Sequence, residues 1–273
     1  MKQKKILITG ASGSIGSELV RQLNEKNKLF ILDINESGFF DLLNEQKAKG
    51  HWIHGRVGDI RNQDTLEDVF SDFKPDEVYH AAALKHVTPN ELYPEEAIKT
   101  NVLGTYNLIK FAKRYEVKKF VFISTDKAVN ATCIMGATKR IGEIMVKNQG
   151  YTAVRFGNVL GSRGSVIPIW QEQVNKGKKI TITHPDMKRY FMTIEEAVNL
   201  VIKAGEMSKG GEIFILDMGE QINVLDIAKG IVAKLRNKDI EEIGIRVGEE
   251  MEEKLMTKEE EKKAIKKDNF YII

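Results

Sequence analysis

The residues best suited to chemistry are Thr125, Asp126 and Lys127, which follow the apolar run 119–123 through Ser124. The run predicts a buried parallel strand, and open parallel sheets present their ligands at the carboxyl ends of their strands. A carboxyl group beside an amine can serve as a general acid and a general base. Taken alone, such a pair is more often a solvated surface pair, so the surrounding elements must decide.

A helix predicted to run to about residue 148 carries Met135 and Lys139, which are four residues apart. Residues at this spacing share one helix face, so we expect the thioether and the ammonium to point toward the same cavity. A thioether cannot carry a proton, so Met135 can shape a pocket without acting as an acid or base.

A glycine-rich turn follows the predicted strand 5–9 and precedes a helix predicted over 17–24. Gly10 allows a tight turn, Gly13 lets a pyrophosphate approach the backbone, and Gly16 lets helix and strand pack closely. The amides at the start of the helix favour phosphate charge. This arrangement predicts a dinucleotide-binding loop.

The predicted strand 29–32 ends at Asp33, which lies twenty residues after Gly13. A carboxylate at this distance is typical of the group that binds the adenosine ribose hydroxyls. It repels a 2′-phosphate, and Arg21 and Arg56 are the nearest arginines, so NAD is favoured over NADP.

Further strands are predicted at 52–55 and 77–80, separated by a helix over 64–73. Asp59 follows the first of these strands and could contact the adenine. The second is followed by three alanines that leave room for a cofactor, with ordinary close packing as the alternative: Ala81, Ala82 and Ala83.

Two polar residues in this region keep alternative interpretations. His86 is either a general acid or an exposed loop histidine. Asn101 lies within a helix predicted over 94–116, and it is either exposed or holds a water or a backbone carbonyl beside the active site.

Five strands alternating with helices before residue 125 predict an α/β fold with a Rossmann-type doubly wound parallel sheet. Beyond it, the sequence predicts helices at 163–174, 194–207 and 224–235, strands at 179–183 and 211–217, and a charged, solvated helix over 249–267. We expect a NAD-binding domain over 1–160, to which 189–216 returns. We expect a smaller, interleaved α/β substrate domain over 161–188 and 217–273.

The composition is that of an ordinary globular protein of 273 residues, with 30% charged and 42% hydrophobic residues. The net charge of +3 is too small to indicate nucleic acid as a partner. No apolar run is long enough to span a membrane. Cys133 is the single cysteine, which fits a reducing cytoplasm, and we interpret it as incidental. The sequence predicts no metal site.

Several motifs together resemble an extended short-chain dehydrogenase/reductase, and more narrowly the nucleotide-sugar 4,6-dehydratases. They are the segments 9–16, 80–87, 124–129, 135–140, 155–162 and 184–187. The chain is most similar to the C5-retaining UDP-N-acetylglucosamine branch of polysaccharide biosynthesis proteins, with Met135 at the position of the family's tyrosine. Many relatives carry a membrane-spanning amino-terminal region, whereas this chain begins at its first strand, as a soluble form or an excised domain would.

The resemblance implies a role for each residue of the site. Asp126 would protonate the C6 hydroxyl, Lys127 would take the C5 proton, Thr125 would bind the C4 hydroxyl, and Lys139 would hold the nicotinamide ribose, beside Met135. NAD would be tightly bound and recycled, and its implied contacts are Gly10, Ser12, Gly13, Ser14, Ile15, Gly16, Asp33, Asp59, Ile60, Ala81, Ala82, Ala83 and Lys139. The implied contacts to the UDP-sugar are Lys85, His86, Asn101, Asn158, Ser165, Val166, Thr181, Arg189, Arg246 and Glu249.

The resemblance also implies a homo-oligomer that pairs through the helices around 94–116 and 136–148. It leaves two enzymatic alternatives, an inverting 4,6-dehydratase with 5-epimerase activity and a UDP-hexose 4-epimerase. A module that has lost catalysis and only senses NAD is a third. The family's lysine is replaced by Glu250, which affects the rim of the nucleotide pocket.

Overall fold

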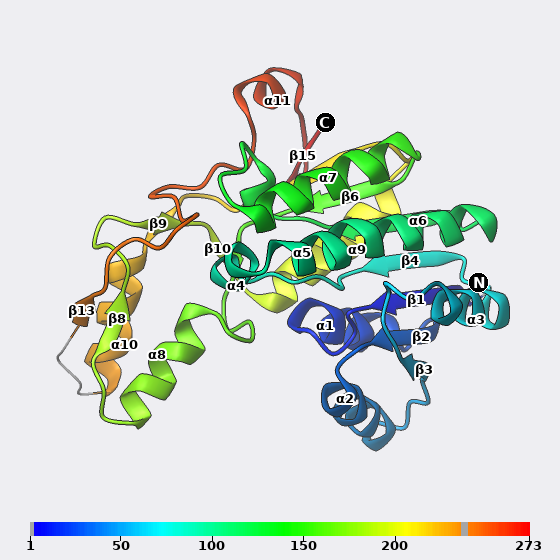
Figure 1. Cartoon of the computed structure of the whole chain (residues 1–273), viewed down its shortest axis with the longest axis horizontal. Helices are drawn as coiled ribbons and strands as arrows, with labels where there is room; N and C mark the ends of the chain where they lie inside the picture. Colours follow the sequence, from blue (N-terminus) through cyan, green and yellow to red (C-terminus); the bar gives the residue numbers. More distant parts are fainter. Residues whose placement is uncertain (1–2, 236–239) are drawn as a thin grey trace.

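A nine-stranded sheet forms the centre of the computed structural model, which describes residues 3–235 and 240–273 (Figure 1). The strand order is β14-β15-β11-β6-β5-β4-β1-β2-β3. Neighbours are parallel from β3 to β11, and β15 runs antiparallel to both β11 and β14. The strands are β1 Lys5–Thr9, β2 Lys28–Asp33, β3 His54–Val57, β4 Glu77–His80, β5 Lys119–Ile123, β6 Thr152–Arg155, β11 Ile213–Leu216, β14 Ile265–Lys267 and β15 Phe270–Ile272. The predicted α/β class with a Rossmann-type sheet is confirmed.

Helices cover both faces of this sheet. Gly205 of α9 lies close to Val121, whereas Gly142 of α7 lies against the neighbouring Phe122. Adjacent residues of a strand point to opposite faces, so α7 and α9 lie on opposite sides. Contacts group α1 with α9, and α3 and α7 with α6. The bounds are α1 Ser14–Leu23, α3 Gln63–Phe73, α6 Thr105–Arg114, α7 Ile134–Asn148 and α9 Ile194–Met207.

A second, smaller hydrophobic core lies beside the sheet, built around the buried residues Trp170, Ile180 and Val224. Its elements lie together at the left of Figure 1: α8 Val166–Asn175, β8 Ile180–Ile182, α10 Val224–Leu235 and β13 Ile240–Glu242. A separate core supports our division into a NAD-binding and a substrate domain, which stays a proposal. The assignment of all of 217–273 to the substrate domain needs correction at its end, because β14 and β15 extend the central sheet and Phe270 is fully buried against Phe214.

Several predicted elements differ from the observed ones in extent. The helix predicted over 94–116 is divided into α5 Pro94–Ala97, the π-helical turn η1 Ile98–Gly104 and α6. The strand predicted at 52–55 begins two residues later. The structure also contains elements that the sequence did not predict: α2 Glu36–Ala48, α4 Val87–Leu92, η2 Asp126–Ala128, β7 Asn158–Val159, β9 Lys188–Arg189, β10 Phe191–Met192 and β12 Ile222–Asn223.

The predicted solvated helix over 249–267 is wrong, apart from the short α11 Lys258–Lys263. Glu253 and Leu255 are buried, and Glu260 forms an ion pair with the buried Arg155. These contacts hold the segment against the body of the protein, whereas a helix exposed to solvent on all sides would make none of them. No helix of the described residues is long and apolar enough to cross a membrane.

Candidate active site

Backbone hydrogen bonds fix Asp126 at the carboxyl end of β5. Ser124 N donates to Val154 O at 2.7 Å, and Asp126 N donates to Phe156 O at 3.0 Å. The chain then turns into η2, where Thr125 Oγ1 donates to Asp126 Oδ1 at 2.9 Å. The predicted position of this segment at the edge of the sheet is confirmed.

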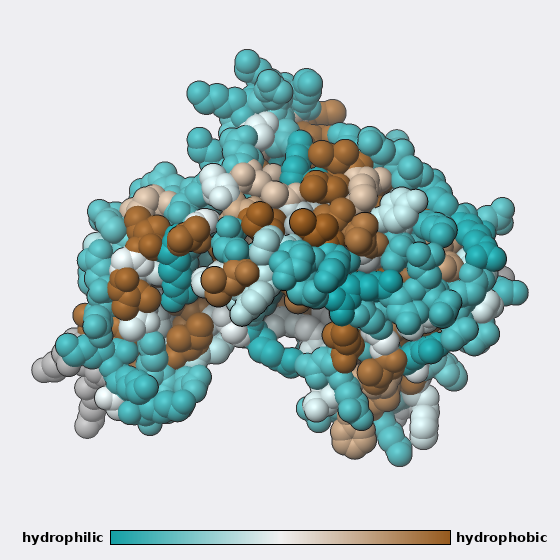
Figure 2. Space-filling view, in the orientation of Figure 1, coloured by the Kyte–Doolittle hydropathy of each residue, from teal (hydrophilic) through white to brown (hydrophobic). Residues whose placement is uncertain are grey.

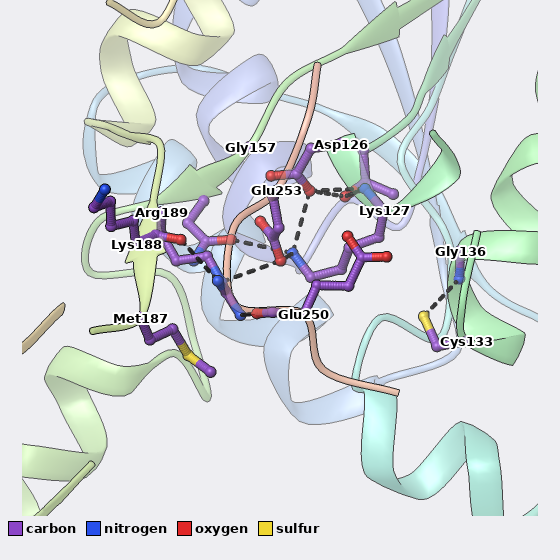
Figure 3. Close-up of polar contacts among 12 residues, drawn as sticks. Asp126, Lys127, Cys133, Gly136, Gly157, Met187, Lys188, Arg189, Glu250 and Glu253 are labelled. Atoms are coloured by element: carbon purple, nitrogen blue, oxygen red, sulfur yellow. Dashed lines mark hydrogen bonds and ion pairs between the residues drawn. The ribbon is translucent and has the colours of Figure 1, made fainter. Parts of the chain in front are cut away.

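Lys127 lies at the centre of a cluster of polar groups (Figure 3). Its Nζ is 3.1 Å from Asp126 Oδ1, 2.7 Å from Glu253 Oε1 and 3.3 Å from Asn158 Oδ1. The side chain of Asp126 is 0% exposed and that of Lys127 is 23% exposed. The two groups are therefore a buried pair and not a solvated surface pair.

The environment sets the charges of this pair. Burial alone would lower the pKa of Lys127, but the carboxylates of Asp126 and Glu253 raise it above its ordinary value. Burial alone would raise the pKa of Asp126, but the Lys127 ammonium and its hydrogen bonds hold it below its ordinary value. At neutral pH the resting pair is therefore an ammonium and a carboxylate.

A cavity of about 150 Å³ adjoins this cluster. It is lined by residues from widely separated segments: Val87, Asp126, Lys127, Val129, Thr132, Cys133, Asn158, Arg189, Gly248, Glu249, Glu250 and Glu253. The structure thus brings together five predicted site residues, Asp126, Lys127, Asn158, Arg189 and Glu249. Cys133 also serves the fold, because its Sγ accepts a hydrogen bond from Gly136 N at the start of α7, so it is not incidental.

Arg189 is not available to a diphosphate as the sequence predicted. It is buried, its Nη1 and Nη2 atoms donate to the carbonyls of Lys188, Met251 and Glu250, and its Nε lies 3.1 Å from Glu253 Oε1. These bonds occupy most of the donors of the guanidinium. Arg189 therefore holds the 250–253 segment over the Asp126–Lys127 pair.

Met135 and Lys139 are both buried on one face of α7, as predicted. Neither is among the described residues that line the 150 Å³ cavity, so the prediction of a shared cavity is not met there. Lys139 Nζ lies over the Phe122 ring, 4.1 Å from its centroid. Burial lowers the pKa of Lys139 to about 7, and Glu143 partly opposes that shift.

The glycine loop has the close packing that a dinucleotide-binding turn requires. A Cβ on Gly16 would lie 2.1 Å from Gly10 O, whereas one on Gly13 would meet only that atom, at 3.2 Å. Gly10 has a φ of +67° and packs against the backbone of Ala82. Gly13 therefore leaves space for a phosphate, and the alanines pack beneath the loop, so the residues present fit NAD.

Asp33 lies beside this loop at the end of β2. Its Oδ2 accepts from Ser12 N and its Oδ1 from Asn35 N, both at 2.8 Å. Each oxygen keeps a further lone pair for a ribose hydroxyl.

The two predicted cofactor contacts after β3 are already packed against other residues. Asp59 Oδ2 lies 2.7 Å from Arg61 Nε, and Ile60 is buried against Gly104.

The loop before α8 crosses toward the glycine turn. Arg163 N donates to Ser14 Oγ at 2.9 Å, and Gly164 packs against the His86 ring. His86 and Lys85 are exposed where the loop crosses. Of the two interpretations of His86, the structure agrees with an exposed loop histidine, and it lies near the phosphate-binding turn. Ile15, on α1, is partly buried against the main core.

Asn101 does not face open space, contrary to its prediction as a substrate contact. Its Oδ1 accepts from Leu84 N at 2.8 Å, and its Nδ2 donates to Leu84 O and Thr138 Oγ1. The π-helical turn η1 places it there. It therefore orders the loop after β4, which agrees with the alternative that it holds a backbone carbonyl.

The remaining predicted substrate residues lie at the smaller core and its rim. Ser165 and Val166 begin α8. Thr181 Oγ1 accepts from Gln173 Nε2, within the smaller core. Arg246 is exposed, and its N donates to Glu249 Oε2 at 3.2 Å.

Glu253 is the one group of the central cluster that the sequence did not predict. Burial raises the pKa of Glu253 to about 8; the ammonium of Lys127 partly opposes the shift and Asp126 adds to it. The charged composition of 249–267 concealed this residue, although the apolar Met251, Leu255 and Met256 flank it. A larger hollow of about 1020 Å³ lies away from the cluster, between α7 and α11, and contains none of the predicted catalytic residues.

Comparisons with known proteins show the family of this chain. The family model for polysaccharide biosynthesis protein matches residues 6–273. The capsular polysaccharide biosynthesis protein CapD of Staphylococcus aureus is 46% identical over 95% of this chain, which spans only 46% of CapD. A UDP-glucose 4-epimerase of Rickettsia bellii is 36% identical over 99% of this chain and 82% of its own length.

Among solved structures, that of Pen from Bacillus thuringiensis superposes with a TM-score of 0.95 at 38% identity, covering 100% of this chain and 88% of Pen. The predicted resemblance to nucleotide-sugar enzymes is thereby confirmed at the level of the family. The chain belongs to the polysaccharide biosynthesis protein family, as an extended short-chain dehydrogenase/reductase of the nucleotide-sugar type.

Proposed function

We propose that this chain is an NAD-dependent 4,6-dehydratase that converts UDP-N-acetylglucosamine to the UDP-4-keto-6-deoxy sugar for surface glycan biosynthesis. The observation that carries the proposal is the buried Asp126–Lys127 pair at the end of β5, with 3.1 Å between carboxylate and ammonium. A dehydratase needs an acid at C6 and a base at C5, and this pair supplies both after one proton transfer.

The cofactor would lie along the glycine loop, with Gly13 and Ser14 at the pyrophosphate, Asp33 at the adenosine ribose and Lys139 at the nicotinamide ribose. When bound, NAD supplies a hydride acceptor for C4 and a hydride donor for C6. The chain's own groups then move protons: Lys127 takes the C5 proton, made acidic by the C4 ketone, and Asp126 protonates the departing C6 hydroxyl. After the water leaves, Lys127 returns a proton to C5, and the proton removed from the C4 hydroxyl restores the Lys127 ammonium, so the protons balance over one cycle.

Met135 leaves the proton of the C4 hydroxyl without a tyrosine to accept it. Thr125 Oγ1 lies 2.9 Å from Asp126 Oδ1, which supports a route from the C4 hydroxyl through Thr125 to the Asp126 carboxylate; Asp126 binds only one proton, so in this route its proton comes from C4 and Lys127 must lose its own proton to another group. The neutral form of Lys139 is a second acceptor, because its pKa of about 7 leaves much of the amine unprotonated at neutral pH. Met135 itself is buried and shapes the wall of α7.

The principal alternative is a 4-epimerase, in line with the name of the Rickettsia bellii relative. An epimerase has no use for an acid at C6, so a buried Asp–Lys pair favours the dehydratase. The pair also opposes a degenerate NAD-sensing module, because burying two charged groups costs free energy that a non-catalytic fold would gain nothing from.

Mass spectrometry across a panel of UDP-sugars tests the proposal. UDP-N-acetylglucosamine should lose one water, with no net consumption of NAD. A product of unchanged mass that is the C4 epimer would establish the epimerase instead, and no turnover with NAD bound would favour the sensing module. NMR of the product formed in deuterated water then distinguishes C5 retention from inversion.

We also propose that the chain forms a homo-oligomer through α6 and α7. Large apolar side chains are exposed on α7, on α6 and on the adjoining η1: Ile98 and Leu103 of η1, Tyr106 of α6, and Ile141 and Ile144 of α7. Figure 2 shows hydrophobic residues gathered over the region of α5 and α7. Surfaces of this kind commonly mark protein contacts.

The cytoplasmic location stays a prediction from the single cysteine.

A further inference from the structure

The carboxyl groups of Asp126 and Glu253 both contact Lys127 Nζ, at 3.1 Å from Asp126 Oδ1 and 2.7 Å from Glu253 Oε1, and each influences the pKa of the other. Asp126 Oδ2 and Glu253 Oε2 are both buried, and neither meets an N–H or O–H donor among the described residues. Two ionised carboxylates cannot form a hydrogen bond, because each only accepts. A proton on one carboxyl would satisfy both oxygens at once.

The donors around each carboxyl indicate which one holds the proton. Asp126 Oδ1 accepts from Thr125 Oγ1, Lys127 N and Lys127 Nζ, at 2.9, 2.8 and 3.1 Å. Glu253 Oε1 forms ion pairs with Lys127 Nζ at 2.7 Å and Arg189 Nε at 3.1 Å. The three hydrogen bonds to Asp126 stabilise its ionised form.

We propose that Glu253 is the protonated member of this pair in the resting site and donates a hydrogen bond to Asp126, so that Lys127 faces one carboxylate charge instead of two. Glu253 is thus a positioning residue for the acid–base pair. The consequence for catalysis rests on the proposed function, whereas the protonation state itself does not.

The surrounding groups act on Glu253 in both directions. Burial and Asp126 raise the pKa of Glu253, Lys127 and Arg189 oppose the shift, and the net result is a pKa of about 8. The charged or titratable groups around Glu253 are Asp126 and Lys127 of η2, Arg189 of β9, Cys133 before α7, and Glu249 and Glu250 of its own segment. Arg189 and Gln221 fix the segment, with Gln221 Nε2 donating to Glu253 O at 2.7 Å.

The proton balance shows what a neutral Glu253 contributes. One N–H bond of Lys127 breaks and an O–H bond forms on Asp126, giving an amine and a carboxylic acid. Asp126 then gives its proton to the C6 oxygen as the C6–O bond breaks, while Lys127 takes the C5 proton. Both groups return to their resting forms, and Glu253 keeps its proton throughout. A second carboxylate at 2.7 Å would instead hold the proton on Lys127 and oppose the first transfer.

Infrared spectroscopy of the protein without substrate tests the protonation state. At pH 7 the wild type should show the C=O stretch of a buried carboxylic acid, which Glu253→Gln should lose. Glu252→Gln is the matched control, because Glu252 is the exposed neighbour that pairs with Lys188. If Glu253→Gln does not fold, wild-type protein labelled with ¹³C in the glutamate carboxyls should show the band shifted. A band that persists in Glu253→Gln, is insensitive to glutamate labelling, or is absent from the wild type would overturn the proposal.

The pH dependence of turnover tests the catalytic consequence. Above about pH 8 the turnover number of the wild type should fall about tenfold per pH unit as Glu253 ionises. Glu253→Gln should lose this alkaline decline, because its amide stays neutral, and Glu252→Gln should keep it. An unchanged decline in Glu253→Gln would refute the role of Glu253. If the wild type removes no water from UDP-N-acetylglucosamine, the proposed function fails, and the infrared measurement alone decides the protonation state.

Discussion

Lys139 Nζ lies 4.1 Å from the centroid of the Phe122 ring, between α7 and the end of β5. The ring face attracts the ammonium, but burial of the whole side chain dominates and lowers the pKa of Lys139 to about 7. This lysine is thus near its titration midpoint at neutral pH.

The first prediction concerns stability. Between about pH 7 and 10.5 the unfolded chain binds the Lys139 proton and the folded chain does not, so this residue makes the protein more stable as pH rises through that window. In urea titrations without NAD, the free energy of unfolding of the wild type relative to Lys139→Met should rise by up to about 5 kcal/mol across this window. Lys147→Met, on the exposed face of α7, should show no such difference. If the difference in free energy of unfolding between the wild type and Lys139→Met does not change with pH, Lys139 has an ordinary pKa.

Lys127→Ala should lower the rate of water loss at least about 100-fold, because it removes the base at C5. NAD should stay bound, since Lys127 lies outside the glycine loop, and calorimetric titration with NAD checks this. Lys176→Ala is the control, because Lys176 pairs with Glu172 on the surface of α8. Retained elimination in Lys127→Ala would mean that another group takes the C5 proton.

The glycine loop should respond differently at two positions. Gly13→Ala should fold, because its Cβ would meet only Gly10 O at 3.2 Å, but it should bind NAD much more weakly, because the methyl group occupies the space for the phosphate. Gly16→Ala should also lose stability, because its Cβ would lie 2.1 Å from Gly10 O. Calorimetric titration with NAD and thermal unfolding separate the two effects.

Gly230→Ala controls for the change of residue type, because nothing lies within 4 Å of a Cβ at that position of α10. Unaltered NAD affinity in Gly13→Ala would exclude the glycine loop as the pyrophosphate site.

Arg155 and Glu143 form a fully buried ion pair, with 2.7 Å between Arg155 Nη2 and Glu143 Oε2. Glu143 also accepts from Ser124 Oγ at 2.6 Å, so the pair supports the strand end that leads to the catalytic residues. Glu143→Gln should cost about 3 kcal/mol in urea unfolding, because it removes the charge that compensates Arg155. Glu259→Gln on the exposed face of α11 should change stability by less than about 0.5 kcal/mol. If Glu143→Gln also changes the free energy of unfolding by less than about 0.5 kcal/mol, Glu260 alone compensates the charge of Arg155.

The exposed apolar side chains of η1, α6 and α7 predict that the chain forms a homo-oligomer. Light scattering after size exclusion should give a dimer or larger species for the wild type. Leu103→Glu and Ile144→Glu should shift it toward the monomer, because each places a charge in the buried contact. Ile265→Glu is the control, being equally apolar and 69% exposed on β14. A wild type that is monomeric at micromolar concentration would contradict the predicted interface.

The sequence determined the central sheet and the chemistry at its edge, because both depend on local patterns. Short apolar strands alternating with amphipathic helices specify a parallel sheet, and such a sheet brings strand ends to one edge. This placed Gly13, Asp33 and Asp126 correctly relative to the elements that hold them. Met135, four residues before Lys139, likewise followed from helical spacing.

Only the tertiary structure decided what surrounds the pair. Glu253 lies 126 residues beyond Lys127 in a charged segment that looks solvated, and its burial depends on Arg189 and Gln221 from other elements. An arginine at position 189 looks the same in the sequence whether it binds a diphosphate or backbone carbonyls. Only the folded structure shows which acceptors its N–H groups meet. Long-range contacts of this kind leave no periodicity in the sequence, so the opposing charges of the Asp126–Lys127–Glu253 cluster became visible only in three dimensions.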